Sequence, residues 1–251
     1  MSALLVGLVA FACLFGGALL GMRLRNALPD HHLGNDSRHL LEIGLGIIGT
    51  MAGLVLGLLV ASATGSYNAQ RNELLDLSSK AVLLDRILAH YGPDASAPRA
   101  ALRVAAQQML IRVWPQENSS GAQLDPLAGR GEVVLDKIED LAPTSDRQRS
   151  LKPEAIGLAI NLAEVRWLMF EQTGSSISAP LLVLLIFWFT ITFVGFGIFS
   201  PSNTTVVVAL GLCALAVSGA IFVTLEMYTP FQGLVQISSL PLREALAHLG
   251  R

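Results

Sequence analysis

The residues best able to do chemistry lie close together near the start of the chain. The segment Asp30-His31-His32-Leu33-Gly34-Asn35-Asp36-Ser37-Arg38-His39 holds three of the five histidines and two carboxylates. Imidazole and carboxylate groups bind transition metals, and histidine titrates near neutral pH, so a metal site or a pH sensor is chemically feasible. The spacing matches no compact ligand pattern, however, and a solvated loop is the simpler interpretation. We therefore expect no metal site here.

No other group of residues indicates catalysis. The sequence contains no phosphate-binding glycine loop, Gly-x-Ser-x-Gly, His-Glu-x-x-His, Cys-x-x-Cys or calcium-binding loop. The two cysteines, Cys13 and Cys213, both fall in apolar segments, where we expect them to act as small apolar residues. The sequence thus predicts no catalytic residue and no cofactor, in a protein that is not an enzyme.

The charges are distributed unevenly along the chain. Only 14% of its 251 residues are charged, against about 25% in an ordinary globular protein. Residues 1–22, 43–70 and 172–225 contain no Asp, Glu, Lys or Arg. This excludes a purely soluble enzyme, and a net charge of −2 argues against nucleic acid as a partner. The expected partner is a lipid bilayer.

Four segments are long and apolar enough to cross a bilayer, which takes about 20 residues. They are residues 3–20, 43–63, 179–199 and 204–225. The first lacks a preceding basic residue, so we expect a retained helix and not a cleaved signal. The Pro201 turn joins the last two as a hairpin, and a charged loop, 23–42, joins the first two. We predict an all-α, polytopic membrane protein with four transmembrane helices and a helical soluble bundle between helices two and three.

This pattern divides the chain into four parts. Residues 1–65 form membrane helices one and two, 66–176 the soluble bundle, 177–226 the membrane hairpin, and 227–251 a tail packed on the bundle. In the bundle we expect helix two to continue to the Gly92-Pro93 stop, followed by helices at about 96–114, 131–141 and 153–172. Apolar residues spaced three and four apart mark the buried face of the extension of helix two. They are Leu74, Leu77, Ala81, Leu84, Leu88 and Tyr91, which we call the seam. The last helix has a similar series: Ile156, Ile160, Ala163, Trp167 and Phe170.

Membrane helix two carries a stripe of glycines, Gly49, Gly53 and Gly57, spaced four apart. Such a stripe lets another helix approach closely, either within the chain or at a subunit interface or pore wall. Thr50 and Ser62 are hydroxyls on the same helix, and Gly17 and Gly21 form a shorter stripe on helix one. The stripe and the two hydroxyls are our candidates for helix packing or a pore wall.

Helix three is rich in aromatic residues, and Phe189, Phe193 and Phe196 share a face, where we expect them to pack or to meet lipid. No charge lies deep in any of the four helices. Coupled transporters generally keep ionisable groups inside the bilayer, so their absence argues against a pump. It leaves a channel open, because hydroxyls, backbone or apolar constrictions can line a pore.

Two stretches resemble a known family. One is helix two with its extension, through the glycine stripe, Tyr67 and Arg71 to Tyr91-Gly92-Pro93. The other is the tail motif of Glu226, Pro230, Phe231 and Gly233, an acidic residue followed by Pro-Phe-x-Gly. Both resemble bacterial bestrophin-like membrane proteins, a domain family of unknown function distantly related to the bestrophin anion channels. Arg166, shortly before the third helix, also resembles a family position.

The resemblance implies a homo-oligomeric ion channel in the bacterial inner membrane that conducts inorganic anions. In our channel hypothesis, helix two lines the pore. The resemblance also implies that the long soluble segment is cytoplasmic. The arginines of loop 23–42 indicate the opposite orientation by the positive-inside rule. The alternative function is a non-conducting membrane scaffold or signalling partner that uses the helical bundle as its interaction surface.

Overall fold

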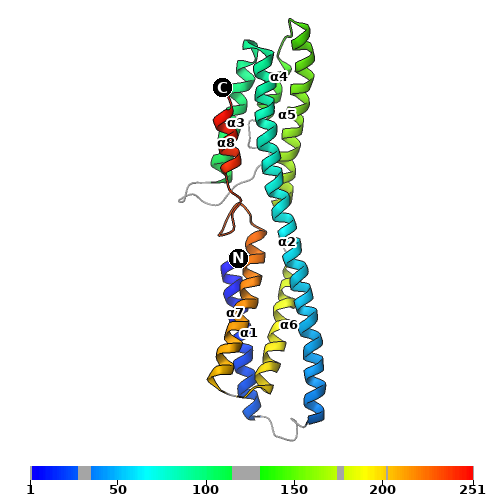
Figure 1. Cartoon of the computed structure of the whole chain (residues 1–251), viewed down its shortest axis with the longest axis vertical. Coiled ribbons are helices and arrows are strands. Elements are labelled where there is room, and N and C mark those ends of the chain that lie inside the picture. Colours follow the sequence, from blue (N-terminus) through cyan, green and yellow to red (C-terminus); the bar gives the residue numbers. More distant parts are fainter. Residues whose placement is uncertain (1, 28–34, 115–130, 174–177, 202, 251) are drawn as a thin grey trace. The chain divides into compact units, whose positions relative to one another are not determined.

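The computed structural model describes every residue except 1, 28–34, 115–130, 174–177, 202 and 251. All regular elements among the described residues are helices, which confirms the predicted all-α class (Figure 1). In chain order they are α1 (Ala3–Ala27), α2 (Asn35–Tyr91), the 3-10 turn η2 (Pro93–Ala95), α3 (Ser96–Val113), α4 (Gly131–Glu139), α5 (Asp146–Thr173), α6 (Ala179–Phe199), α7 (Thr204–Met227) and α8 (Leu240–His248).

The chain divides into two compact units. The membrane unit comprises Met1–Gly65 and Ser176–Tyr228, and the soluble unit comprises Ser66–Ser175 and Thr229–Arg251. Helix α2 contributes to both, with the division after Gly65.

In the membrane unit, α1, α6, α7 and a stretch of α2 are each long and apolar enough to cross a membrane. This confirms the four predicted spans. Helix α1 lies alongside α6 and α7 (Figure 1). Their facing side chains form an apolar core that includes Leu14, Leu185, Phe193 and Ile221, each no more than 3% exposed.

Glycines allow α1 and α6 to cross with their backbones in contact. A Cβ on Gly21 would overlap the carbonyl oxygen of Val194, and one on Gly197 would overlap that of Ala18. Only a residue without a side chain fits at either position. The short glycine stripe of helix one is therefore a packing surface, and its partner glycine on α6 had no clear pattern in the sequence.

The link between the first two helices differs from our expectation of a charged loop over 23–42. Helix α1 continues to Ala27 and α2 already begins at Asn35. Polar residues outside the bilayer can extend a helix, because its backbone hydrogen bonds form within the segment whether the side chains face lipid or water. The loop is therefore shorter at both ends than the apolar spans indicated.

The soluble unit is built around the predicted seam of α2. All six seam residues are buried, from Leu74 and Leu84 at 0% exposed to Leu77 at 6%. Helix α2 ends at Tyr91, as the Gly92-Pro93 stop predicted. Gly92 has a φ of 115°, a backbone conformation that favours glycine.

Helix α5 differs from the predicted helix in both its start and its buried face. It begins at Asp146, because Ser145 and Gln148 form a reciprocal cap: the Gln148 amide donates to Ser145 Oγ (3.2 Å), and Gln148 Oε1 accepts from the Ser145 amide (3.3 Å). Pro153 consequently lies inside the helix. Three of the five predicted face residues are exposed: Ile160 (45%), Trp167 (50%) and Ala163. Ile156 does pack against the core, and the side chain of Phe170 lies outside the described part of the helix. Among the described side chains of α5, the buried ones are instead Ala155, Ala159, Val165 and Met169.

The tail belongs to the soluble unit and ends in α8. Trp114 Nε1 donates to the Ile237 carbonyl (2.9 Å), and the Trp114 ring meets Phe231 edge-on with centroids 5.6 Å apart. The Ile237 amide also donates to the Pro230 carbonyl (2.7 Å), which closes the turn between them. The chain from Thr229 onward is thus held by both apolar and polar contacts.

Candidate functional site

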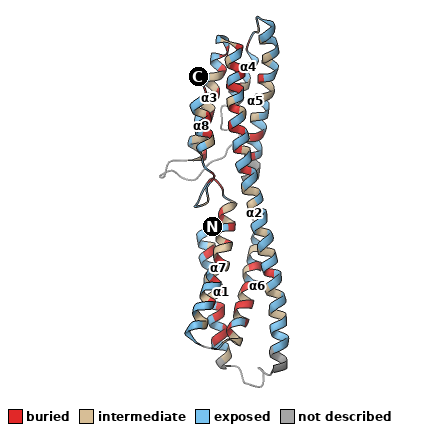
Figure 2. Ribbon diagram, viewed as in Figure 1, coloured by how far each residue is buried: buried red, intermediate tan, exposed pale blue. Residues whose placement is uncertain are grey.

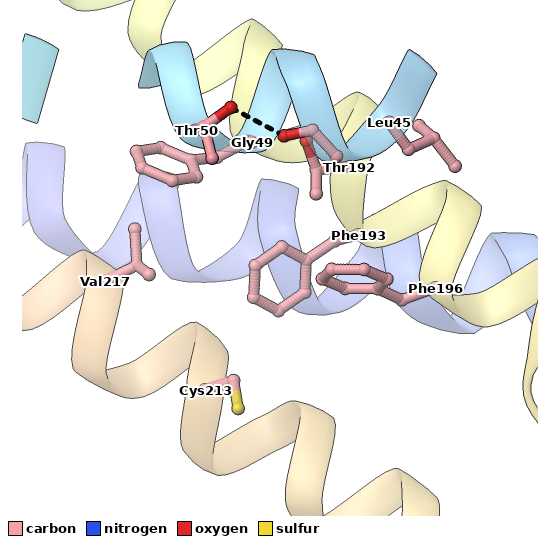
Figure 3. A pocket seen from close by; sticks show the side chains of 10 residues that line it. Leu45, Gly49, Thr50, Thr192, Phe193, Phe196, Cys213 and Val217 are labelled. Atoms are coloured by element: carbon pink, nitrogen blue, oxygen red, sulfur yellow. Dashed lines mark hydrogen bonds between the residues drawn. The ribbon is translucent and has the colours of Figure 1, made fainter. Parts of the chain in front are cut away.

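The membrane unit contains a pocket bounded by α2, α6 and α7 (Figure 3). Its volume is about 410 Å³. Helix α2 supplies one wall, α6 contributes three phenylalanines and a threonine, and α7 supplies the third side. The lining residues are Leu45, Gly46, Gly49, Thr50, Phe189, Thr192, Phe193, Phe196, Cys213 and Val217.

Both threonine hydroxyls in the pocket are satisfied by their own helices. Thr50 Oγ1 donates to the carbonyl of Gly46 at 2.8 Å, drawn as the dashed line in Figure 3. Thr192 Oγ1 donates to the Trp188 carbonyl at 3.0 Å. Each hydroxyl therefore already donates its proton and needs no ligand or water to accept it. The remaining side chains of the lining are aliphatic, aromatic or a thiol.

The glycine stripe of α2 splits between two environments. A Cβ on Gly49 would lie 3.5 Å from Thr192 Cγ2, so at this position α2 packs against α6. A Cβ on Gly53 or Gly57 would meet nothing within 4 Å. Packing within the chain accounts for the first glycine of the stripe and leaves the other two uncovered.

The membrane stretch of α2 is the most exposed of the four spans. Only 6% of its apolar 18-residue stretch is buried. The corresponding stretches of α1 and α6 are 33% buried, and that of α7 is 17% buried. Figure 2 shows this stretch mainly in the colours of exposed and intermediate residues. Large apolar side chains account for much of its exposed face: Ile47, Met51, Leu54 and Leu58 are between 50% and 68% exposed.

The other predicted site residues lie outside the pocket. Ser62 is exposed and accepts a hydrogen bond from the Tyr228 hydroxyl (3.1 Å) within the membrane unit. Glu226 is buried near the end of α7, at 7% exposed. In the tail, Pro230 and Phe231 are buried, and Gly233 is exposed with a φ of 87°. The Pro-Phe-x-Gly motif thus provides a packed turn of the soluble unit.

Only part of the histidine-rich segment 30–39 is among the described residues. Asp30, His31 and His32 lie outside the described residues, and His39 is an exposed residue of α2. Within the described part of the chain, no group of three or more His, Cys, Asp and Glu side chains could hold a metal ion.

Sequence reasoning missed two features of the structure. Thr192 gave no signal in the sequence, because the aromatic residues around it indicated only packing or lipid contact. Asp85 and Arg99 form an ion pair in the soluble unit, and Asp85 is 2% exposed. A signal for Asp85 did exist: an acidic residue directly after seam residue Leu84 lies next to the buried face of its helix.

Comparison with known families agrees with this architecture. The Bestrophin-like domain matches residues 8–242, which include most of the first membrane span, the whole of the other three and most of the tail. No curated protein and no solved structure matches the chain. The chain is therefore a membrane protein that belongs to the bestrophin-like domain family.

Proposed function

We propose that this protein is a homo-oligomeric ion channel of the bacterial inner membrane, in which α2 from each subunit lines a pore for small inorganic anions. The observation that carries the proposal is the exposure of α2. Only 6% of its apolar 18-residue stretch is buried within one chain. A helix that neighbours in its own chain cover so little is available to the subunits of an oligomer.

Two surfaces of α2 suit the two roles of such a helix. Gly53 and Gly57 leave a strip without side chains, where a helix of a neighbouring subunit can approach closely. Ile47, Leu54 and Leu58 are exposed at helical spacing and would face the pore. A pore lined in this way would be largely apolar, as in channels that control conduction by an apolar constriction.

The absence of charge on the membrane stretch of α2 is compatible with the passage of anions. Residues 43–70 contain no acidic side chain, so this stretch of α2 offers no fixed negative charge that would repel an anion. It also contains no basic side chain that would trap one. A neutral pore suits passive conduction, which requires weak binding along the path. A pump would require a charged coupling site within the bilayer.

Recording single-channel currents from the purified protein in planar bilayers tests the proposal. We expect discrete openings whose reversal potential follows the chloride gradient. Gly53→Leu should disrupt the contact between subunits and abolish the current. Gly16→Leu is the matched control, because Gly16 on α1 also has nothing within 4 Å of a Cβ but lies on another helix. Oligomers of verified mass that pass no current would refute the channel.

A second candidate function is a non-conducting scaffold, favoured by the exposed apolar residues of the soluble unit. Leu75 and Leu83 on α2 are 40% and 50% exposed, and Ile160 on α5 is 45% exposed. A partner protein that binds the intact protein and is released by Leu83→Ser, in a preparation that passes no current, would favour this function.

A further inference from the structure

The pocket in the membrane unit lies at the depth of lipid hydrocarbon. Thr192 is seven residues from the end of α6 at Phe199, and Cys213 is nine residues from the start of α7 at Thr204. At about 1.5 Å per residue these positions lie roughly 10–14 Å below the α6–α7 turn. Half of a hydrocarbon core is about 15 Å thick. The pocket therefore lies within the apolar half-layer on the side of this turn.

The interior of the pocket is suited to hydrocarbon and not to water. The hydroxyls of Thr50 and Thr192 are bonded to carbonyls of their own helices. No charged residue is among the lining residues. A water molecule needs two to four polar partners to occupy a cavity, and apolar cavities stay dry. If the pocket were empty, its phenylalanine walls would lose dispersion contacts.

The size of the pocket favours a thin ligand. Its volume of about 410 Å³ is well above the roughly 150 Å³ of an apolar cavity that holds benzene. A helix with its side chains is about 11 Å across, so the same 410 Å³ would contain only about 4 Å of helix, less than one turn. A helix of a second copy would not fit inside, whereas a flexible hydrocarbon chain would.

The pocket opens at the surface of the membrane unit. Gly46 and Thr50 of α2, Phe196 of α6 and Cys213 of α7 are all exposed. Phe189 and Phe193 are buried, at 7% and 3% exposed, and form the deep wall. A chain from the surrounding lipid can enter sideways without leaving the hydrocarbon layer.

We propose that this pocket binds one acyl chain of a membrane phospholipid from the leaflet on the side of the α6–α7 turn. All the lining residues come from one chain, so the inference does not depend on ion conduction or on the oligomer. The bound chain would replace missing protein contacts between α2 and the α6–α7 hairpin. The site would make these helices sensitive to the lipids around them.

Native mass spectrometry of the protein, purified in detergent from vesicles of phosphatidylglycerol and phosphatidylethanolamine, tests the proposal. We expect a retained phospholipid on each wild-type chain. Gly46→Phe places a ring in the pocket, in a space with nothing within 4 Å of a Cβ. Excluding two methylene groups should lower occupancy about tenfold. Leu212→Phe is the control, because Leu212 is a 62% exposed residue of α7 outside the pocket.

The two cysteines supply an independent measurement on the unmodified protein. Cys213 lines the pocket, whereas Cys13 is exposed on α1 outside it. We expect removal of bound phospholipid to speed alkylation of Cys213 by a small apolar maleimide and to leave Cys13 unchanged. This measurement does not depend on whether Gly46→Phe folds. Cys213→Phe is a second variant that fills the pocket.

Three outcomes would overturn the proposal. One is wild-type protein that retains no lipid, or Gly46→Phe protein that retains as much as Leu212→Phe. Another is a bound mass equal to a free fatty acid, which would indicate a different ligand. The third is lipid-free protein in which Cys213 is protected by a second copy and becomes reactive when the oligomer dissociates.

Discussion

Arg99 and Asp85 join α3 to α2 through a bidentate salt bridge inside the soluble unit. Arg99 Nε lies 2.8 Å from Asp85 Oδ1, and Nη2 lies 2.9 Å from Oδ2. The Gly250 amide also donates to Asp85 Oδ2 at 3.2 Å, so the end of the tail bonds to the same carboxylate. The two neighbouring helices α2 and α3 and the distant end of the tail therefore share one buried carboxylate.

Replacing this carboxylate should destabilise the soluble unit. Asp85→Asn removes the negative charge that Arg99 Nε and Nη2 bond to. It should lower the free energy of unfolding by about 3 kcal/mol, the lower end for a buried pair, because the Arg99 side chain is 21% exposed. Asp76→Asn is the control, because its bond to Lys80 is largely exposed and contributes less than about 1 kcal/mol. Urea unfolding followed by tryptophan fluorescence measures both. Equal effects from the two variants would contradict the role of the pair.

The same pair should show little dependence on alkaline pH. The hydrogen bonds to Asp85 raise the pKa of Arg99 above its ordinary value. A raised pKa means that the stabilisation is complete below the unfolded-state value and is lost only as the pH rises through the folded-state value. We therefore expect the difference in stability between wild type and Asp85→Asn to be constant from neutral to mildly alkaline pH. A difference that falls over this range would indicate that another group titrates.

The tail should detach when its aromatic contact is removed. Phe231→Ala deletes a side chain that is 5% exposed, and such deletions cost about 3–5 kcal/mol. Trp114→Phe keeps the ring contact but loses the hydrogen bond to Ile237, which costs about 1 kcal/mol. Limited proteolysis should cleave the tail fastest in Phe231→Ala. Leu240→Ala, at a 57% exposed position, should leave the rate unchanged.

The crossing of α1 and α6 should tolerate no side chain at Gly21. An alanine there overlaps the Val194 carbonyl and forces the helices apart, at a cost of about 1–3 kcal/mol. Gly16→Ala, also on α1 but in open space, should stabilise the helix slightly. Thermal unfolding in detergent micelles distinguishes them. A Gly21→Ala protein as stable as the Gly16→Ala protein would contradict the observed crossing.

Much of the fold could be predicted because its signals are local. The absence of charge located the four spans, and Gly92-Pro93 located the end of α2. The alternating spacing of three and four residues between apolar side chains identified the buried seam from Leu74 to Tyr91. In α5 two local signals competed: Pro153 indicated a helix start, whereas Ser145 and Gln148 formed the actual cap.

The pairing of helices was not local and could not be predicted in the same way. The pair Gly17 and Gly21 has the same spacing as Gly53 and Gly57. Yet a Cβ on either of the first two glycines would meet α6, whereas one on either of the last two would meet nothing within 4 Å in the described part of the chain. Spacing shows that a helix has a smooth face but does not identify the neighbour that covers it. The pocket likewise depends on three helices at once, so no single segment could indicate it.

The central claim is that α2 lines a conducting path, and chemical modification of single cysteines tests it most directly. In a protein with Cys13→Ser and Cys213→Ser, single cysteines are placed at Leu54 on α2 and at Leu212 on α7, which are 68% and 62% exposed. A water-soluble thiol reagent is then added during current recording. The channel proposal predicts block at Leu54→Cys and none at Leu212→Cys. Current that continues unchanged at Leu54→Cys, or that is absent from verified oligomers, would contradict it.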